Sequence, residues 1–336
     1  MKTLFCCSFV LGAIAFAADP GYHVIQKIPL GGEGGWDYLT VDSAARRLYV
    51  SHATHVVVVD LDTGKPAGDI PDTPGVHGVA LAPELNRGFV SNGKANTATI
   101  FDLKTLKAIG QVKTGANPDA ILYDPFSKRV LTFNGRSNDA TVFDAATGAV
   151  AGTIALGGKP EFSTTDAKGK IYVNIEDTGE VLQIDSQKLA VVKRISIKPC
   201  EEPSGMGLDV AHHRVFSVCG NKMMTVLDTE AGKVIATVPI GSGTDGAGFD
   251  AGAGLAFSSN GEGTLTVVRE TSAGKFEVAE TVKTQRGART MAVDPKTHKV
   301  YLPTAEFGPT PAPTAEAPRP RPTPVKDSFT VLVVGK

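Results

Sequence analysis

The sequence predicts an all-β fold, a single seven-bladed β-propeller with four-stranded blades. Three observations predict it: a repeat of about 42 residues, four strand-like runs in each repeat, and chain ends that carry complementary parts of one repeat. The Asp that ends the third run recurs at spacings of 42, 42, 41, 43 and 41 residues, at Asp60, Asp102, Asp144, Asp185 and Asp228, with Arg269 in the next slot. A period of roughly 40–45 residues with four strands is typical of propellers.

The repeat is clearest in residues 117–158. Its four apolar runs are DAILYD, RVLTF, ATVFD and VAGTIAL, and the turns or loops between them are PFSK, NGRSND and AATG. Short runs rich in β-branched and aromatic residues, bounded by Gly, Pro, Asn or Asp, favour strands over helices. One such sheet has too small a core to be stable alone, so its faces need neighbouring copies.

The two ends of the chain are expected to complete one blade together. HVIQKIPLGG (His23–Gly32) matches a fourth strand without the first three, while RTMAVD, KVYLPT and SFTVLVVG near the C-terminus supply three strands without a fourth. Their pairing would close the ring and leave no free sheet edge. The count of seven blades comes from the first strands, which end near Asp42, Ala82, Asp124, Asp166, Asp209, Asp250 and Asp294.

Residues 1–17 resemble a secretory signal peptide, which leaves residues 18–336 for the propeller. Lys2 provides the positive start, Leu4 to Phe16 the apolar segment, and Ala15-Phe16-Ala17 the cleavage pattern. The alternative, a membrane anchor, is disfavoured because the apolar run is short for a membrane span. We therefore expect a periplasmic or secreted protein with no membrane span after cleavage, and we expect a monomer.

Two cysteines remain after the leader, Cys200 and Cys219. In an exported protein an even pair predicts a disulfide. The repeat places Cys200 on the loop before an inner strand and Cys219 at the end of the next strand, on the same face of the ring. The alternatives are a redox couple or a metal pair with His212 and His213, but those histidines lie on a turn that opens at the opposite face.

A proline-rich loop, residues 308–327, interrupts the last blade. It contains seven prolines between Gly308 and Val325, where other blades have only a few residues. Such a density favours an extended, semi-rigid and exposed segment. It is either a solvated spacer or a lid or docking strip on the face that carries the Cys200 loop.

Several motifs resemble those of the YVTN-repeat (YncE-like) β-propellers of bacterial envelopes. Degenerate forms of the tetrapeptide occur in LYVSH (Leu48–His52), IYVNI (Ile171–Ile175), GFVSNG (Gly88–Gly93) and VYLPT (Val300–Thr304), and the V-x-D-x-x-T-G turn occurs in VVDLDTG and VFDAATG. The resemblance covers the mature chain and implies an exported seven-bladed propeller. It implies little chemistry, because no catalytic motif defines the family.

One position in each repeat is expected to line the mouth of the central channel. It lies five residues before the end of the first strand and is occupied by Asp37, His77, Asp119, Glu161, Ser204, Asp245 and Arg289. The carboxylates would cap backbone N–H groups or face channel water, bind a metal or cationic ligand, or act as acid and base. His52, His55 and His77 lie in adjacent blades and could also converge, although scattered surface histidines are the simpler interpretation.

The function predicted from these features is a non-enzymatic binding scaffold that uses the channel mouth and the proline-rich loop. Its ligand would be a small molecule, a metal ion or a partner protein; no cofactor is identifiable. The alternative is a metal- or carboxylate-dependent hydrolase or lyase. Nucleic acid is a further alternative by family analogy only, and a formal net charge of -1 makes it an unfavoured partner.

Overall fold

The computed structural model describes residues 21–314, 320 and 322–336. The predicted signal peptide lies outside this range, as do a few positions of the proline-rich loop. None of the helices described is long and apolar enough to cross a membrane.

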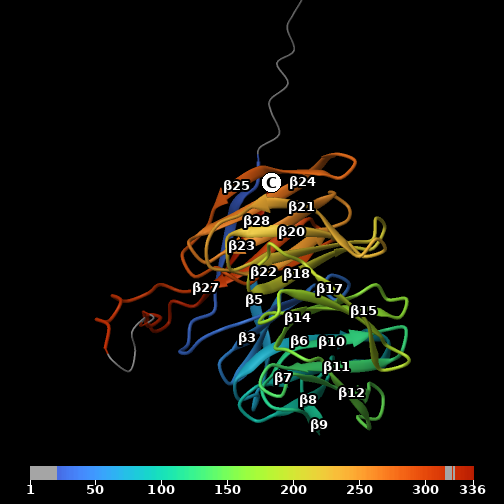
Figure 1. Ribbon diagram of the computed structural model, residues 1–336. Helices are drawn as coiled ribbons and strands as arrows, with labels where there is room; N and C mark the ends of the chain where they lie inside the picture. The colour runs from blue at the N-terminus through green and yellow to red at the C-terminus, as the bar shows by residue number, and fades with distance from the viewer. Residues whose placement is uncertain (1–20, 315–319, 321) are drawn as a thin grey trace, which may run out of the picture.

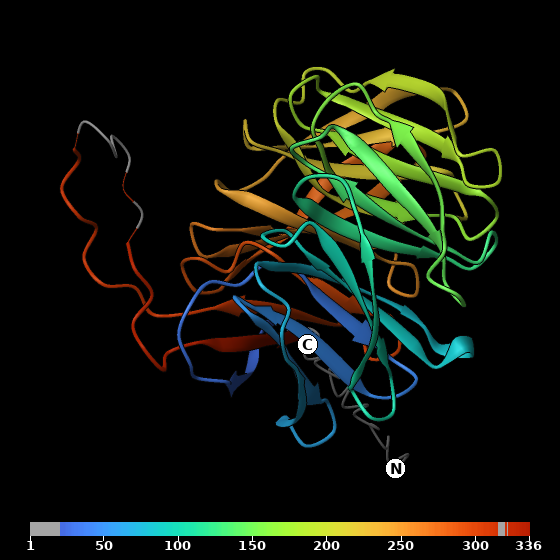
Figure 2. The ribbon, with the colours of Figure 1, turned by 90° about the horizontal axis from the view of Figure 1, so that it is seen from below.

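The described chain forms seven four-stranded antiparallel sheets, which confirms the predicted all-β, seven-bladed propeller (Figures 1 and 2). Blades 1 and 2 consist of β2 (Leu39–Asp42), β3 (Arg47–His52), β4 (His55–Asp60), β5 (Lys65–Ile70), and β6 (Val76–Ala82), β7 (Arg87–Asn92), β8 (Thr97–Asp102), β9 (Ala108–Lys113). Blades 3 and 4 consist of β10 (Pro118–Asp124), β11 (Arg129–Asn134), β12 (Asp139–Asp144), β13 (Val150–Ala155), and β14 (Pro160–Thr165), β15 (Lys170–Ile175), β16 (Glu180–Asp185), β17 (Ala190–Ser196).

The remaining blades follow the same order from the channel outward. Blades 5 and 6 consist of β18 (Pro203–Asp209), β19 (Arg214–Cys219), β20 (Met223–Asp228), β21 (Lys233–Pro239), and β22 (Thr244–Asp250), β23 (Leu255–Asn260), β24 (Thr264–Ser272), β25 (Lys275–Lys283). Blade 7 contains β26 (Ala292–Asp294), β27 (Lys299–Thr304) and β28 (Thr330–Gly335), and a short 3-10 helix, η1 (Pro83–Leu85), lies in the turn after β6.

The ring closes through the strand nearest the N-terminus, as predicted. β1 (His23–Pro29) pairs antiparallel with β28, so blade 7 has the order β1-β28-β27-β26. Thr330 adds a side-chain hydrogen bond from its hydroxyl to the carbonyl of Ile28, at 3.0 Å. The closure buries an edge that would otherwise expose unpaired backbone groups.

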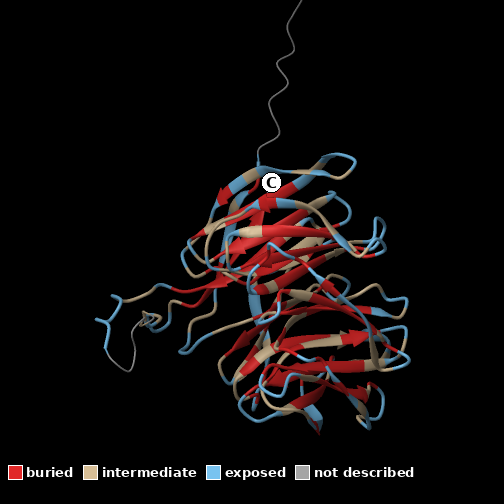
Figure 3. Cartoon of the chain, viewed as in Figure 1, coloured by how far each residue is buried: buried red, intermediate tan, exposed pale blue. Residues whose placement is uncertain are grey.

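The core lies between blades rather than within any one of them. Seven hydrophobic clusters among the described residues each combine side chains of two adjacent blades. Second and third strands are buried on both faces, whereas the outer fourth strands are mostly exposed (Figure 3). This explains why the middle strands are nearly continuous runs of apolar residues while the fourth strands alternate.

The strand-ending Asp of each V-x-D-x-x-T-G motif organises the turn after the third strand. Oδ1 of Asp144 accepts hydrogen bonds from the backbone N–H of Ala146 at 3.0 Å and of Thr147 at 2.7 Å, and from the Thr147 hydroxyl at 2.8 Å. Gly148 follows with a φ of 75°, which favours glycine. The motif therefore serves turn geometry.

Cys200 and Cys219 form the predicted disulfide, with a Cα–Cα distance of 5.4 Å. It joins the loop before β18 to the end of β19, within blade 5. His212 instead contacts Asp209 in the β18–β19 turn, at 2.7 Å between Nδ1 and Oδ2. The alternative metal pairing of the cysteines with His212 and His213 is therefore not what the structure shows.

Candidate functional site at the channel mouth

Backbone irregularities at the start of the inner strands place the predicted mouth residues. The pairing of inner and second strands shifts register around His77, Asp119, Glu161 and Asp245. Such a bulge re-aims a side chain that regular pairing would direct elsewhere. It recurs at equivalent positions, so residues about 42 apart in sequence gather at one end of the channel.

Buried hydroxyl groups on the second strands hold these positions from behind. The Ser91 hydroxyl accepts a hydrogen bond from the N–H of Gly78 at 2.9 Å and donates one to the carbonyl of Asp119 at 2.6 Å, linking blades 2 and 3. Ser259 likewise donates to the carbonyl of Arg289, at 2.5 Å. Both serines are fully buried, so the backbone beneath the mouth is well supported.

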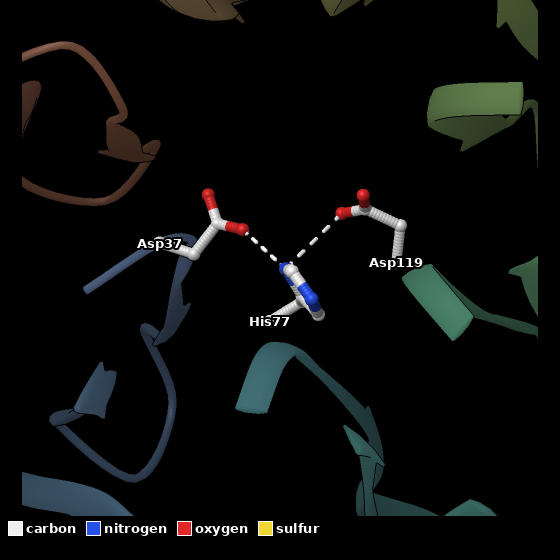
Figure 4. Close-up of side chains that lie close together, drawn as sticks. All are labelled: Asp37, His77 and Asp119. Carbon is white, nitrogen blue, oxygen red and sulfur yellow. Dashed lines mark hydrogen bonds and ion pairs between the residues drawn. The ribbon is translucent and has the colours of Figure 1, made fainter. Parts of the chain in front are cut away.

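Asp37, His77 and Asp119, from three adjacent blades, converge on one point (Figure 4). Nδ1 of His77 lies 2.6 Å from Oδ2 of Asp37 and 3.4 Å from Oδ1 of Asp119. One potential ligand atom from each residue lies within 4.8 Å of the other two. Their side chains keep 15%, 26% and 13% of their surface exposed, so an ion could reach them from solvent.

Charge crowding changes the pKa values of this group. Burial, together with repulsion from Asp37 and Asp245, raises the pKa of Asp119 to about 7 despite the opposing effect of His77. Burial alone would lower the pKa of His77, but the Asp37 hydrogen bond and the charge of Asp119 raise it to about 9. The protonated form of His77 is therefore favoured beside Asp37 and Asp119.

Glu161 of blade 4 extends the acidic surface and has its own basic partner. Burial, followed by repulsion from Asp119, raises the pKa of Glu161 to about 8 against the lowering effect of Lys159. Nζ of Lys159 lies 2.6 Å from Oε1 of Glu161 and also contacts Glu176. Burial opposes the charge of Lys159, but its two carboxylate partners raise its pKa.

Asp245 and Arg289 form an ion pair on the opposite side of the mouth. Nη1 of Arg289 lies 2.9 Å from Oδ2 of Asp245. Burial raises the pKa of Asp245 to about 6, with Arg289 opposing the shift and Asp37 adding to it. Ser204, at the equivalent position of blade 5, adds no charge.

Tyr38 and Phe162, which follow the mouth residues Asp37 and Glu161 in the sequence, pack against each other. Their ring centroids are 5.2 Å apart although they come from blades 1 and 4, which lie across the ring from each other. Burial and the charge of Asp119 raise the pKa of Tyr38 well above its usual value, so its hydroxyl stays protonated.

The structure thus brings together charged residues predicted from the repeat, and it bears on one proposed role, the capping of backbone N–H groups. In the described part of the chain, no backbone N–H donates to the carboxylate of Asp37, Asp119, Glu161 or Asp245. Backbone capping therefore does not explain them. Sequence reasoning missed Tyr38, Lys159 and Phe162. Each lies one or two residues from a predicted mouth position, so the repeat could have indicated them as neighbours of the site.

The histidines do not converge as a group of three. The rings of His52 and His55 are 5.0 Å apart, and His52 stacks on Phe329 at 4.4 Å, while His77 faces the two carboxylates. Burial, with a smaller contribution from His55, lowers the pKa of His52 to about 4. His52 is therefore a neutral, packed side chain.

No protein-family model matches the chain, and neither does any curated protein. Among solved structures, it is similar to hydrazine synthase of Kuenenia stuttgartiensis, with a TM-score of 0.72 and 17% sequence identity. The match covers 80% of this chain and 92% of that chain. At this identity the likeness shows the fold alone.

Proposed function

We propose that this protein is an exported binding propeller that takes a divalent transition-metal ion at the channel mouth. The observation that carries the proposal is the convergence of Asp37, His77 and Asp119 from three blades, with donor atoms within 4.8 Å of one another. The carboxylates accept no backbone hydrogen bonds from the described residues, so their lone pairs remain available to a cation. A bound cation would also relieve the repulsion that raises the pKa of Asp119.

The donor set indicates the class of ion. Two carboxylates and one imidazole suit Zn²⁺, Ni²⁺ or Cu²⁺ better than Ca²⁺ or Mg²⁺, which prefer oxygen ligands alone. His77 has to lose its proton before it can bind a metal, and its pKa is about 9. Metal affinity should therefore increase as the pH rises toward 9, with release of a proton.

The wider assignment has separate support. The leader-like residues 1–17 and the Cys200–Cys219 disulfide favour a periplasmic or secreted location. The repeat motifs, together with the seven-bladed fold, favour membership of the YVTN-repeat propellers. We propose a monomer whose ligands bind at the mouth, and the acidic character of the mouth disfavours nucleic acid.

A metal-assisted hydrolase or lyase is the second candidate. Three protein ligands leave coordination positions open for water or substrate. The pKa values of Asp119, about 7, and Glu161, about 8, lie in the range useful for a general acid or base at neutral pH. Turnover that requires Asp119 would favour this candidate over a scaffold.

The decisive experiment is metal analysis and Zn²⁺ titration of the mature protein, purified without chelator and without affinity histidines. We expect one ion per chain, and at least about tenfold weaker binding after His77→Ala or Asp119→Asn. His298→Ala is the matched control, because His298 also contacts a carboxylate, Asp250, at 2.7 Å but belongs to no described three-ligand cluster. Absence of Zn²⁺ binding, or binding unchanged in His77→Ala, would refute the proposal.

A further inference from the structure

A pocket lies at the edge of the mouth, between blades 6 and 7 and the base of the proline-rich loop, and it shares Asp245 and Arg289 with the mouth. It is a pocket of about 610 Å³, within the range of small-molecule sites. Trp36 and Phe307 form its aromatic wall, Arg286 and Arg289 supply charge, and Pro322 and Pro324 belong to the loop.

Backbone pairing holds the described base of the loop in place. The N–H of Gly308 donates to the carbonyl of Thr323 at 3.0 Å, and the N–H of Val325 donates to the carbonyl of Glu306 at 2.8 Å. Phe307 and Pro324 lie opposite each other in this short ladder. Figures 1 and 2 show the described parts of the connection between β27 and β28 extending away from the ring. The loop therefore contributes a wall to the pocket.

The aromatic wall is packed and shaped by its neighbours. Trp36 stacks on Phe329 with centroids 5.2 Å apart and lies 6.0 Å from Phe307. A Cβ atom at Gly287 would stand 2.5 Å from the Phe307 ring, so only glycine lets that ring lie over the backbone there. The indole Nε1 of Trp36 is buried without a hydrogen-bond partner in the described chain.

The two arginines differ in how far they are already neutralised. Arg289 is paired with Asp245 at 2.9 Å, and Asp245 also lines the pocket. The guanidinium of Arg286 lies 6.0 Å from the centre of the Phe307 ring and forms no ion pair with a described carboxylate. The pocket thus keeps one uncompensated positive charge next to an aromatic surface.

We propose that this pocket binds a small organic carboxylate with an aromatic or apolar body. The planar guanidinium of Arg286 would bind the carboxylate, because arginine presents paired N–H donors that match its two oxygens. The apolar body would lie against Trp36 and Phe307. This site is distinct from the proposed metal site, whose three ligands line no part of the pocket.

The test uses intrinsic fluorescence, because Trp36 is the only tryptophan in the chain. Phenylacetate is titrated into the mature protein, with 2-phenylacetamide as the neutral analogue and phenethylamine as the cationic one. We expect a saturable change in Trp36 emission with a Kd of about 1 mM or below for phenylacetate, and at least about tenfold weaker binding of the two analogues.

Two variants separate the proposed contact from general charge effects. Arg286→Gln should weaken phenylacetate binding at least about tenfold and remove the preference for the carboxylate over the amide. Arg136→Gln makes the same exchange at an exposed arginine of another blade and should leave binding unchanged. No saturable response up to about 10 mM phenylacetate, equal binding of the amide, or unchanged binding in Arg286→Gln would each overturn the proposal. These results do not depend on Zn²⁺ binding, because neither variant touches Asp37, His77 or Asp119.

Discussion

The ring carries two sets of repeated carboxylates whose pKa values shift in opposite directions. In the turns after the third strands, hydrogen bonds from Thr147 lower the pKa of Asp144, and those from Thr105 lower that of Asp102. At the channel mouth, burial raises the pKa of Asp119 and Asp245. Turn carboxylates are surrounded by N–H and O–H donors, whereas mouth carboxylates are buried, lie near one another and accept no backbone hydrogen bond from the described residues.

The same repeat therefore places carboxylates that stabilise turns at one position and carboxylates that form a candidate site at another. A carboxylate whose ionised form is favoured by its surroundings stabilises the fold. A carboxylate whose ionised form is disfavoured costs stability, and such costs are concentrated at functional sites. Variants of both sets, and of Asp294 at the end of the first strand of blade 7, test this contrast.

Removing the buried, hydrogen-bonded carboxylate of Asp294 should cause the largest loss of stability. Asp294 has a fully buried side chain that accepts hydrogen bonds from Ser43 at 2.5 Å, Arg46 at 2.8 Å and Thr297 at 2.7 Å, and so links blade 7 to blade 1. Burial opposes its charge, but these bonds lower its pKa to about 2. Asp294→Ala should lower the free energy of unfolding by about 3 kcal/mol, measured by urea denaturation.

The exposed partner of the same arginine provides the control. Asp62 also contacts Arg46, at 3.0 Å, but keeps 66% of its side chain exposed. Asp62→Ala should therefore cost less than about 1 kcal/mol. Equal losses in the two variants would mean that the inter-blade contact of Asp294 adds nothing.

A metal ion should turn the cost at the mouth into a stabilising contribution. At a free Zn²⁺ concentration of 100 times Kd, the free energy of unfolding should rise by about 2.7 kcal/mol. Thermal or urea unfolding at pH 8 with and without Zn²⁺ measures it. The increase should persist in Asp144→Ala, because Asp144 lies in a turn, and should fall to about 1.4 kcal/mol or less in His77→Ala, which binds Zn²⁺ at least about tenfold more weakly. The same increase in both variants would place the ion elsewhere.

The pH dependence of stability should have opposite signs for the turn carboxylates and for the mouth residues. The folded pKa values of Asp245, Asp119, Glu161 and His77 are raised to about 6, 7, 8 and 9, so the folded state holds these protons more tightly than the unfolded state. Their contribution is complete below the unfolded pKa values and is lost as the pH rises through the folded ones. These four groups should therefore make stability decline progressively from about pH 4, near the unfolded pKa values of the carboxyl groups, to about pH 9.

The variant Asp119→Asn tests whether a mouth carboxylate causes the decline in stability with rising pH. It removes a buried charge, so the variant should be about 1–2 kcal/mol more stable than the wild type at pH 8 and nearly equal to it at pH 4. Urea unfolding midpoints of the variant and the wild type, measured from pH 4 to pH 8, give this difference in stability. A variant less stable than the wild type at pH 8 would show that the attraction between Asp119 and His77 outweighs the cost of burial.

Much of the fold follows from sequence because it depends on periodicity. The repeat places Asp60 and Asp102 at strand ends, and the strand at His23–Pro29 has no partners unless it completes blade 7. The Cys200–Cys219 bridge is similarly predictable, since both residues fall on one face of one blade. In each case the relevant distance is set by regular β geometry.

The pairing within the site is not set by regular geometry. The repeat frame brings His77, Asp119 and Glu161 to the mouth, but bulges decide that His77 faces Asp119 while Glu161 contacts Lys159. The pocket is harder still to predict, because Phe307, Pro322 and Pro324 belong to the long irregular connection between β27 and β28. Contacts between irregular segments depend on their individual paths, which a repeat pattern does not encode.

The smallest expected effect lies in the turns. Asp144→Ala removes three hydrogen bonds from a half-exposed turn and should lower the free energy of unfolding by about 1 kcal/mol at neutral pH. Because its pKa is lowered, this contribution is present above the unfolded pKa and is lost as the pH falls through the folded one, opposite to Asp119.

Blade 6 offers the comparison: Arg269 replaces the Asp and pairs with Glu277 at 2.8 Å across a longer hairpin. Glu277→Ala should cost less than about 0.5 kcal/mol, because both partners are half exposed. If it cost as much as Asp144→Ala, an ordinary surface ion pair would stabilise the turn as well as the Asp motif does, and the motif would owe its recurrence to something other than turn stability.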